Sequence, residues 1–463
     1  MKFWTKDRLK TAIVDCEIYN MPEDWTSSGL RIWHEDFDSD YIALMRGENE
    51  IRGILPKYLP TILEKASAIM TTKAELFKEY NKPIIELQTN PSDVIINMAK
   101  YIRSFFSGKV IAITGSSGKS TTTKILYDVL EQYGVDSNLG RANTSWGISW
   151  NMTCFDIDKR YWAIETSLGG GIARNSQITK PHYAVVTNIA PVHLKENQDI
   201  TIIAKEKSKI FDAMETDQFA ILYKQMNCFD IVYQAAIEKG LKVITYGEFD
   251  SDINVKFENE HSFECFGNKY YLKDVNLSKH IMLDMAVTVA IAHLEDLDMQ
   301  QVLEILKQFK PLEGRGETFE GKISADKFVT VVDESYNANP LSMQESLRGF
   351  KKLIGDKNSI LILGDMSEGG ANSIEQHIAL QEVINEVKPS RILFCGKDIK
   401  RLWEILKFVY PGAYYESVEL LNKEVTSWLK DEDYVFIKSS HSTQLFRTVN
   451  VLKAYIKKYN CPN

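Results

Sequence analysis

The sequence predicts an α/β protein with three domains, and three observations lead to this prediction. The chain has 463 residues, which is too long for a single hydrophobic core. After about residue 106, apolar strands alternate with helices, a pattern typical of mostly parallel sheets. A Pro- and Gly-containing stretch at 311–316 divides this alternating region. We therefore expect an N-terminal domain over 1–105, a central domain over 106–313 and a C-terminal domain over 314–463.

The first 105 residues mix short strands and helices. Tyr41–Leu44 and Pro83–Leu87 are apolar runs that we predict to be strands. We predict helices over Tyr58–Ala68 and over Pro91–Phe106, the second of which leads into the central domain.

The central domain is expected to alternate strands and helices. Its predicted strands are Val110–Thr114, Tyr161–Glu165, Tyr183–Thr187, Phe219–Tyr223 and Val243–Tyr246. Its predicted helices are Ser120–Tyr133, Ile200–Met214, Cys228–Lys239 and His280–Leu294, with a hairpin region over Ile253–Leu272. The C-terminal domain repeats the alternation. Its predicted strands are Phe328–Asp333, Ile360–Gly364, Ile392–Cys395 and Tyr434–Lys438, and its predicted helices are Pro340–Leu353, Ile374–Val387, Ile399–Phe408, Val418–Leu429 and Ser442–Tyr455.

The most informative stretch is KVIAITGSSGKSTTT at 109–123, where an apolar strand runs into a Gly-rich turn and then a helix. Gly115 and Gly118 let the backbone pass close to an anion, since a Cβ there would collide with phosphate oxygens. The loop N–H groups and the helix N-terminus then point at negative charge. Lys119 is placed to reach the outer phosphates, and Ser120 to hold Mg²⁺.

This motif is a short form of the phosphate loop, because Ile113 stands where the strict pattern has another Gly. Many Gly-Ser turns before helices bind nothing. Here the preceding strand, the following helix and the Lys-Ser pair favour a nucleoside triphosphate as ligand. We therefore expect a central P-loop mononucleotide-binding parallel sheet and a C-terminal Rossmann-like α/β domain, with ligands outside the C-terminal strand ends.

Composition excludes several classes of protein. A net charge of −8 without a basic tract argues against nucleic acid as the main partner. Six scattered cysteines without a C-x-x-C pair favour reduced thiols in the cytoplasm over disulfides or a zinc site. No apolar run approaches the roughly 18 residues that a membrane span needs, so we expect no membrane insertion.

Polar clusters follow several predicted strands. Glu165 ends a buried strand before a Gly run, and its place beside the phosphate loop favours a Mg²⁺ ligand over a helix cap. His193 follows the next strand, and its chemistry alone leaves a structural role and a metal role equally open. Lys207 lies on a helix whose composition indicates a solvated lysine face. The run from Asp333 to Pro340 has too many polar residues to serve only as loop caps.

Taken together, these clusters resemble the Mur ligase family, the ATP-dependent amide ligases of peptidoglycan precursor assembly. The matching motifs are Thr114–Thr121, Glu165, Thr187–His193, Ile203–Lys207, Gly314–Gly316, Asp333–Pro340 and Leu363–Glu368 with His377. The resemblance implies an ATP site formed by Gly115, Ser116, Ser117, Gly118, Lys119, Ser120 and Thr121 of the loop, together with Asp284, Arg315 and Asp333. It implies one Mg²⁺ on Ser120 and Glu165, and a second metal site at His193 with a carbamylated Lys207. Lys119, Lys207 and His193 would be catalytic, and Asn143, Thr144, Tyr336, Asn337 and Asn339 would line the substrate side.

The sequence departs from the family pattern at four places. An Asn pair is replaced by Asn143-Thr144, and a His-Asn start with a later Asn on the adenine-side helix is replaced by His280-Ile281 and Asp284. A Lys-Gly-Ser-Arg pattern near the C-terminus reads Lys438-Ser-Ser-His441, and an Asp-Gly-His expected after Tyr41–Glu48 is missing.

Three functions remain open at this point. The first is addition of D-Ala-D-Ala to a UDP-linked tripeptide, through an acyl phosphate and with hinge closure at 312–316. The second is the same chemistry on another small-molecule or peptide acid and amine, in a specialised peptide or polymer pathway. The altered N-terminal domain and Thr144 favour the second function, whereas the intact run Asp333–Pro340 favours the first. The third is a nucleotide-gated binding protein without ligase activity, against which the full set of predicted metal ligands argues. We expect a cytoplasmic monomer.

Overall fold

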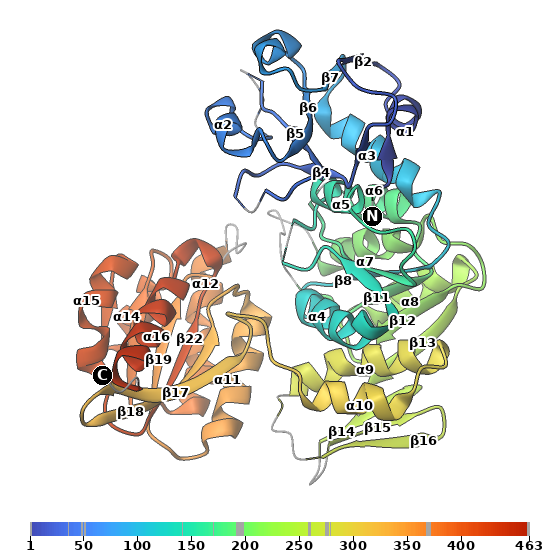
Figure 1. Cartoon of the computed structure of the whole chain (residues 1–463). Helices are drawn as coiled ribbons and strands as arrows, with labels where there is room; N and C mark the ends of the chain where they lie inside the picture. The colour runs from blue at the N-terminus through green and yellow to red at the C-terminus, as the bar shows by residue number, and fades with distance from the viewer. Residues whose placement is uncertain are drawn as a thin grey trace.

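The computed structural model of the chain describes residues 2–35, 37–47, 50, 52–140, 142–169, 171–190, 199–257, 261–273, 277, 279–366 and 372–460. Three α/β regions follow one another, with the N-terminal region above the central one and the C-terminal region beside it (Figure 1). No helix among the described residues is long and apolar enough to cross a membrane.

The N-terminal region is a five-stranded sheet in the order β2-β7-β6-β5-β4, in which only β2 is antiparallel to its neighbour. Its elements are β1 (Trp4–Thr5), α1 (Lys6–Ala12), β2 (Cys16–Tyr19), β3 (Thr26–Ser27), β4 (Leu30–Arg31), β5 (Tyr41–Leu44), α2 (Leu59–Ile62), β6 (Ala66–Thr71), β7 (Ile84–Leu87) and α3 (Pro91–Arg103). The predicted helix over Tyr58–Ala68 is wrong beyond Ile62. The following run becomes β6, an inner strand whose apolar side chains are buried between β5 and β7.

The central region contains a nine-stranded sheet in the order β16-β15-β14-β13-β12-β11-β8-β10-β9, in which seven parallel strands, from β14 to β9 in this order, are extended at the β14 edge by the antiparallel strands β15 and β16. The strands are β8 (Lys109–Thr114), β9 (Val135–Ser137), β10 (Tyr161–Glu165), β11 (Tyr183–Val186), β12 (Phe219–Tyr223), β13 (Lys242–Gly247), β14 (Ile253–Lys256), β15 (His261–Cys265) and β16 (Asn268–Leu272). The helices are α4 (Lys119–Leu130), α5 (Ser145–Met152), α6 (Ile172–Thr179), α7 (Ile200–Ser208), α8 (Phe229–Glu238), α9 (Lys279–Leu294) and α10 (Met299–Lys307).

Alternate side chains of β8 show which helices cover each face of this sheet. Ile111 and Ile113 pack into a core with α4, α9 and α10. Val110 packs with α3 and α5, and Ala112 with α7 and α8, on the opposite face. Because both faces are covered, β8 is a continuous apolar run, as the sequence predicts.

The C-terminal region is a six-stranded sheet in the order β17-β18-β22-β19-β20-β21, parallel except at β17. Its strands are β17 (Glu317–Ser324), β18 (Lys327–Glu334), β19 (Ser359–Gly364), β20 (Arg391–Cys395), β21 (Gly412–Tyr415) and β22 (Asp433–Lys438). Helices α11 (Pro340–Ile354), α13 (Leu380–Val387) and α14 (Lys400–Leu406) cover one face, α15 (Val418–Trp428) and α16 (Phe446–Asn460) cover the other, and α12 (Ser373–Ile378) precedes α13. Helices α1, α5, α6 and α10 and strands β1–β4, β9, β17 and β21 were not predicted from the sequence.

One apolar core crosses from the N-terminal region into the central one. Phe3 and Trp4 at the chain start and Ile95 on α3 belong to the same buried cluster as Trp150 on α5 and Trp162 on β10. The Trp4 indole donates to the Thr153 carbonyl at 2.8 Å, and the Trp150 indole to the Leu30 carbonyl at 2.7 Å. The predicted domain boundary at residue 105 therefore divides a continuous core, and it stays a prediction.

Candidate active site

The phosphate loop lies between β8 and α4, as predicted. Gly118 caps α4 with φ +78°, and an added Cβ would lie 2.7 Å from an Asp284 carboxylate oxygen. A Cβ on Gly115 would lie only 1.9 Å from the Thr187 hydroxyl oxygen. Both glycines are therefore required by close packing of the loop as well as by its backbone conformation.

The end of β11 braces the loop. The Ser117 amide donates to Asn188 Oδ1 at 3.1 Å, and Asn188 Nδ2 donates to the Ser117 hydroxyl at 2.6 Å. The Ser116 amide donates to the Asn188 carbonyl at 3.0 Å. These contacts hold the loop against the end of β11. The sequence placed Asn188 within a motif, but gave it no role.

Two lysines meet at one carbonyl of the loop. Lys119 Nζ donates to the Gly115 carbonyl at 2.8 Å, and Lys207 Nζ donates to the same oxygen at 2.9 Å. The Lys207 residue is only 2 % exposed, whereas Lys205 on the same helix is exposed. The solvated lysine face that composition indicated is therefore wrong for Lys207, which brings a second positive charge to the loop.

Oxygen ligands gather beside the first turn of α4. The buried Ser120 hydroxyl donates to Glu165 Oε2 at 2.6 Å, and Asn143 Nδ2 donates to Glu165 Oε1 at 2.7 Å. A hydroxyl next to a carboxylate is a donor set that suits Mg²⁺, a hard cation that prefers oxygen. His193, the remaining predicted metal ligand, lies outside the described residues. Within the described ranges, no three His, Cys, Asp or Glu side chains are grouped as a metal site.

Three further side chains complete this part of the site. Thr144 precedes α5 without a capping bond from its side chain, and its methyl group lies 2.9 Å from where a Cβ on Gly169 would be. Thr121 is buried in the first turn of α4. Asn138 was not predicted: its side chain exchanges hydrogen bonds of 2.8 and 2.9 Å with the Glu165 backbone. Its position just after a short strand beside β10 is the signal that could have found it.

Asp284 lies on α9 against the phosphate loop. It is 6 % exposed and accepts a hydrogen bond from the Thr122 hydroxyl at 3.0 Å. Burial raises the pKa of this carboxyl well above its usual range, although the Thr122 bond opposes the shift. The carboxyl is therefore held between the phosphate loop and the first turn of α4, within hydrogen-bonding distance of Thr122.

The Asp333 carboxylate accepts hydrogen bonds from the backbone of the C-terminal region. Its two carboxylate oxygens accept from the Gly314 amide at 3.1 Å and the Ser335 amide at 3.0 Å. Burial raises the pKa of Asp333, and hydrogen bonding from Ser335 opposes the shift. Arg315, between Gly314 and Gly316, stacks its guanidinium 3.9 Å from the ring centre of Tyr336. Tyr336 is 46 % exposed, so this stack presents an aromatic face and a cation at the edge of the sheet.

The remaining predicted substrate residues lie in the same loop. Asn339 caps α11 in a reciprocal capping box with Ser342, a structural role that the resemblance did not imply. The Asn337 carbonyl accepts from Lys438 Nζ at 3.1 Å. Lys438 also forms a buried ion pair with Glu334, at 3.0 Å from Oε2.

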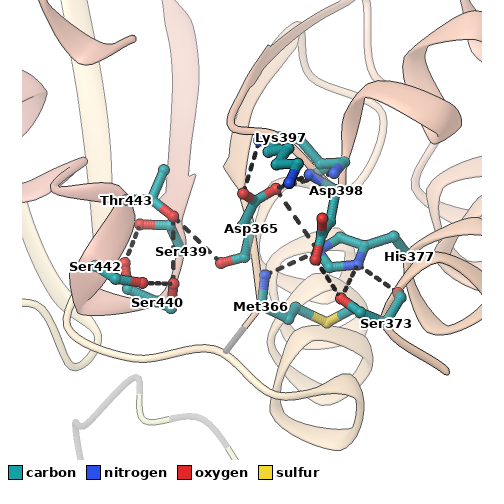
Figure 2. Close-up of polar contacts among 11 residues, drawn as sticks. Asp365, Met366, Ser373, His377, Lys397, Asp398, Ser439, Ser440, Ser442 and Thr443 are labelled. Carbon is teal, nitrogen blue, oxygen red and sulfur yellow. Dashed lines mark hydrogen bonds and ion pairs between the residues drawn. The ribbon is translucent and has the colours of Figure 1, made fainter. Parts of the chain in front are cut away.

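Asp365 links three strand ends of the C-terminal sheet (Figure 2). Its carboxylate accepts from the amides of Lys397 at 2.7 Å, Asp398 at 3.0 Å and Ile399 at 2.9 Å. Its carbonyl accepts from the Ser440 amide at 2.8 Å. A cavity of about 420 Å³ opens beside it, between the ends of β19, β20 and β21 and the first turn of α15.

His377 fixes the backbone next to Asp365. It is fully buried, its Nε2 accepts from the Met366 amide at 2.8 Å, and its Nδ1 lies 2.6 Å from the Ser373 carbonyl (Figure 2). Both ring nitrogens therefore have backbone partners. The part of the motif at Ser367–Glu368 lies outside the described residues.

The structure thus brings together Lys119, Lys207, Ser120, Glu165, Asn143 and Asp284 at the rim of the central sheet. It places Arg315, Asp333, Tyr336, Asn337 and Asn339 at the rim of the C-terminal sheet.

Known protein families match both regions that carry these rims. A model of the Mur ligase middle domain matches residues 113–286, and one of the Mur ligase glutamate ligase domain matches 314–441. UDP-N-acetylmuramoyl-tripeptide–D-alanyl-D-alanine ligase of Rickettsia prowazekii is 26 % identical over 409 residues, covering 85 % of this chain and 88 % of the relative. The enzyme of the same name from Escherichia coli is 26 % identical over 314 residues, covering 65 % and 67 %.

Solved structures share the fold. MurF from Acinetobacter baumannii has a TM-score of 0.79 at 20 % identity, covering 97 % of this chain and 99 % of that one. MurF from Thermotoga maritima, solved with ADP, has a TM-score of 0.70 at 20 % identity, covering 93 % and 98 %. With two family domains in the expected order and relatives matched over most of their length, this chain belongs to the Mur ligase family of ATP-dependent ligases.

Proposed function

We propose that this protein uses ATP to join D-alanyl-D-alanine to a UDP-N-acetylmuramoyl-tripeptide. The observation that carries the proposal is the rim of the central sheet, where Lys119 and Lys207 meet at the Gly115 carbonyl beside the Ser120–Glu165 pair. Such a site suits phosphoryl transfer between two anions, and the names of the relatives supply the substrate pair.

The proposed reaction has two steps. A carboxylate oxygen of the tripeptide attacks the γ-phosphorus of ATP, the bond to ADP breaks, and an acyl phosphate forms. The dipeptide amine then attacks the acyl carbon, phosphate leaves, and the nitrogen loses a proton. Carboxylate and triphosphate repel each other, so Lys119 and the loop amides would offset that repulsion in a site shielded from water.

Ser120 and Glu165 would hold one Mg²⁺, which would neutralise phosphate charge. We further propose that Lys207 is carbamylated by CO₂ and serves a second metal site together with His193. Carbamylation would turn a buried cation into an anion, so the lysine would orient cationic partners instead of phosphates. The buried position of Lys207 next to the loop supports this role.

The C-terminal region would bring Arg315 and Asp333 to the nucleotide when it closes over the central sheet, and Asp284 would face adenine. Tyr336, Asn337 and Asn339, with Asn143 and Thr144 from the central region, would shape the space for the substrates. We place the enzyme in the cytoplasm, where ATP is available. We propose that the enzyme is a monomer.

A second candidate function is the same chemistry on another acid and amine. The replacement at Thr144 and the divergent N-terminal region favour it. A binding protein without ligase activity is a third outcome of the same experiment.

A phosphate-release assay with ATP and panels of acids and amines separates the three. We expect release that requires both UDP-N-acetylmuramoyl-tripeptide and D-alanyl-D-alanine, with the amide product confirmed by mass spectrometry. Release only with other pairs would select the second function, and ATP binding without release from any pair would select the third.

A further inference from the structure

The buried ion pair between Lys438 and Glu334 lies at the functional edge of the C-terminal sheet. The two residues are register partners at the last positions of β22 and β18, where ligands of parallel α/β sheets are bound. The Lys438 side chain is 2 % exposed and that of Glu334 13 %, so both charges are largely removed from water. Buried ion pairs contribute little net stability, which leaves the geometry they impose as their main effect.

That geometry concerns the loop between β18 and α11. Besides Glu334, Lys438 Nζ holds the Asn337 carbonyl at 3.1 Å, and the Tyr336 amide is bonded to the Gly314 carbonyl at 3.1 Å. Lys438 therefore fixes the turn that carries the exposed Tyr336 ring, and with it the Arg315 guanidinium stacked on that ring.

The pair also lies where the central and C-terminal regions meet. A Cβ on Gly316 would be 3.5 Å from Glu334 Oε1 and 4.0 Å from the Ile281 side chain on α9. Glu334 and Lys438 are close enough to His280 on α9 to change its pKa in opposite directions, while burial lowers it. Glu334 thus lies beside Gly316, in the turn that joins the two regions.

We propose that Lys438 and Glu334 are a positioning pair, which holds the Tyr336–Asn337 turn so that the Arg315–Tyr336 stack meets the nucleotide when the regions close. The expected effect on turnover rests on the proposed function. The expected effect on the Tyr336–Asn337 turn rests on the geometry alone. Neither residue touches the reacting atoms.

The same sheet provides a matched control. Arg391 and Asp433 form a second buried ion pair, at 2.5 Å, with side chains 7 % and 0 % exposed. They begin β20 and β22, so they lie at the opposite edge of the sheet from the strand ends that carry the site. Removal of this pair changes the same kind of interaction without touching the Tyr336 turn.

The experiment compares the double variants Lys438→Met/Glu334→Gln and Arg391→Met/Asp433→Asn with the wild type. We expect the first to lower turnover by about 10²-fold, because misplaced positioning groups cost rates of that order. Its dissociation constant for ATP, measured by calorimetry, should change far less than its turnover, because the phosphate loop lies in the central region and only the contact from the Arg315–Tyr336 stack is misplaced. The control should keep its turnover. Turnover within twofold of wild type in the first variant, or an equal loss in both, would overturn the proposal.

Hydrogen exchange without ligands tests the structural part even if no substrate pair supports turnover. The Tyr336 amide should exchange at least tenfold faster in Lys438→Met/Glu334→Gln and unchanged in the control, and an unchanged rate in both would overturn the proposal. If the double variant does not fold, the single variant Lys438→Arg takes its place in the exchange experiment. The planar guanidinium of Arg cannot reproduce the hydrogen-bond geometry of the Lys438 ammonium. We expect this variant to fold and to exchange faster at Tyr336. Wild-type exchange in that variant would count against the proposal.

Discussion

The rims of the central and C-terminal sheets use their charged residues in opposite ways. At the central rim, the Glu165 carboxylate is held by the side chains of Ser120 and Asn143, which a metal ion can replace or join. At the C-terminal rim, Asp333 and Asp365 accept backbone amides, two and three respectively. The central rim therefore has its charges available for chemistry, whereas the C-terminal rim uses its acids to build the loops that carry Arg315 and Tyr336.

The largest effect should come from Lys119. Lys119→Ala should abolish amide formation, a loss of about 10³-fold or more, because the phosphates lose their nearest fixed cation. The fold should be unchanged, as measured by circular dichroism and thermal unfolding. Lys124→Ala is the matched control, since Lys124 lies on the same helix and pairs with Asp128. Near-normal turnover in Lys119→Ala would contradict the catalytic role that we assign to the central rim.

Lys207 comes next. Lys207→Ala should lower turnover by about 10²- to 10³-fold, and short carboxylates should restore part of it by occupying the place of the carbamate. Lys205→Ala, on the exposed face of the same helix, should leave turnover unchanged. The absence of rescue by formate, acetate or propionate across a concentration series would count against carbamylation.

At the C-terminal rim, Asp365→Asn should reduce stability more than chemistry. Loss of the charge from a carboxylate that accepts three amides should cost about 2 kcal/mol of unfolding free energy, measured in urea. Turnover per folded molecule should fall less than tenfold. Asp356→Asn, at an exposed position, is the control. If Asp365→Asn kept full stability and lost activity as Lys119→Ala does, the contrast between the rims would be wrong.

The last effect changes acid stability and not turnover, and it concerns the edge of the central sheet opposite its rim. Burial and the nearby charges of Arg103 and Lys109 lower the pKa of His182 to about 4, and its Nδ1 accepts from the Val110 amide. The unfolded chain therefore binds this proton first as the pH falls from about 6.5 to 4, so stability declines over that window, by on the order of 2 kcal/mol. His182→Asn should flatten this slope in urea titrations. If the unfolding free energy of the variant fell equally steeply with pH, other groups would be the cause of the acid sensitivity.

Local sequence signals predicted the central rim well. The phosphate loop, its strand and its helix are confirmed, and Glu165 ends its strand as expected, because a buried parallel strand and a Gly-rich turn are encoded within a few residues. The helix over Tyr58–Ala68 failed because a short apolar run is compatible with either a helix or an inner strand.

Long-range pairing explains what could not be predicted. Glu334 and Lys438 are 104 positions apart, and only the parallel register of β18 and β22 makes them partners. The burial of Lys207 depends on how its helix packs against the loop, which its lysine-rich composition conceals. Asp365 was part of a motif, yet its three amide partners come from the following strand's loop.

The shared core of Phe3, Trp4, Trp150 and Trp162 has a thermodynamic consequence. Melting either the first hundred residues or the nine-stranded sheet would expose these rings to water, so the two regions should lose structure in a single cooperative event. The six-stranded sheet keeps separate cores on its two faces. The sequence predicts three domains, but calorimetry should therefore resolve only two heat-absorption peaks. ATP should raise the temperature of the peak that contains its phosphate loop more than that of the other peak.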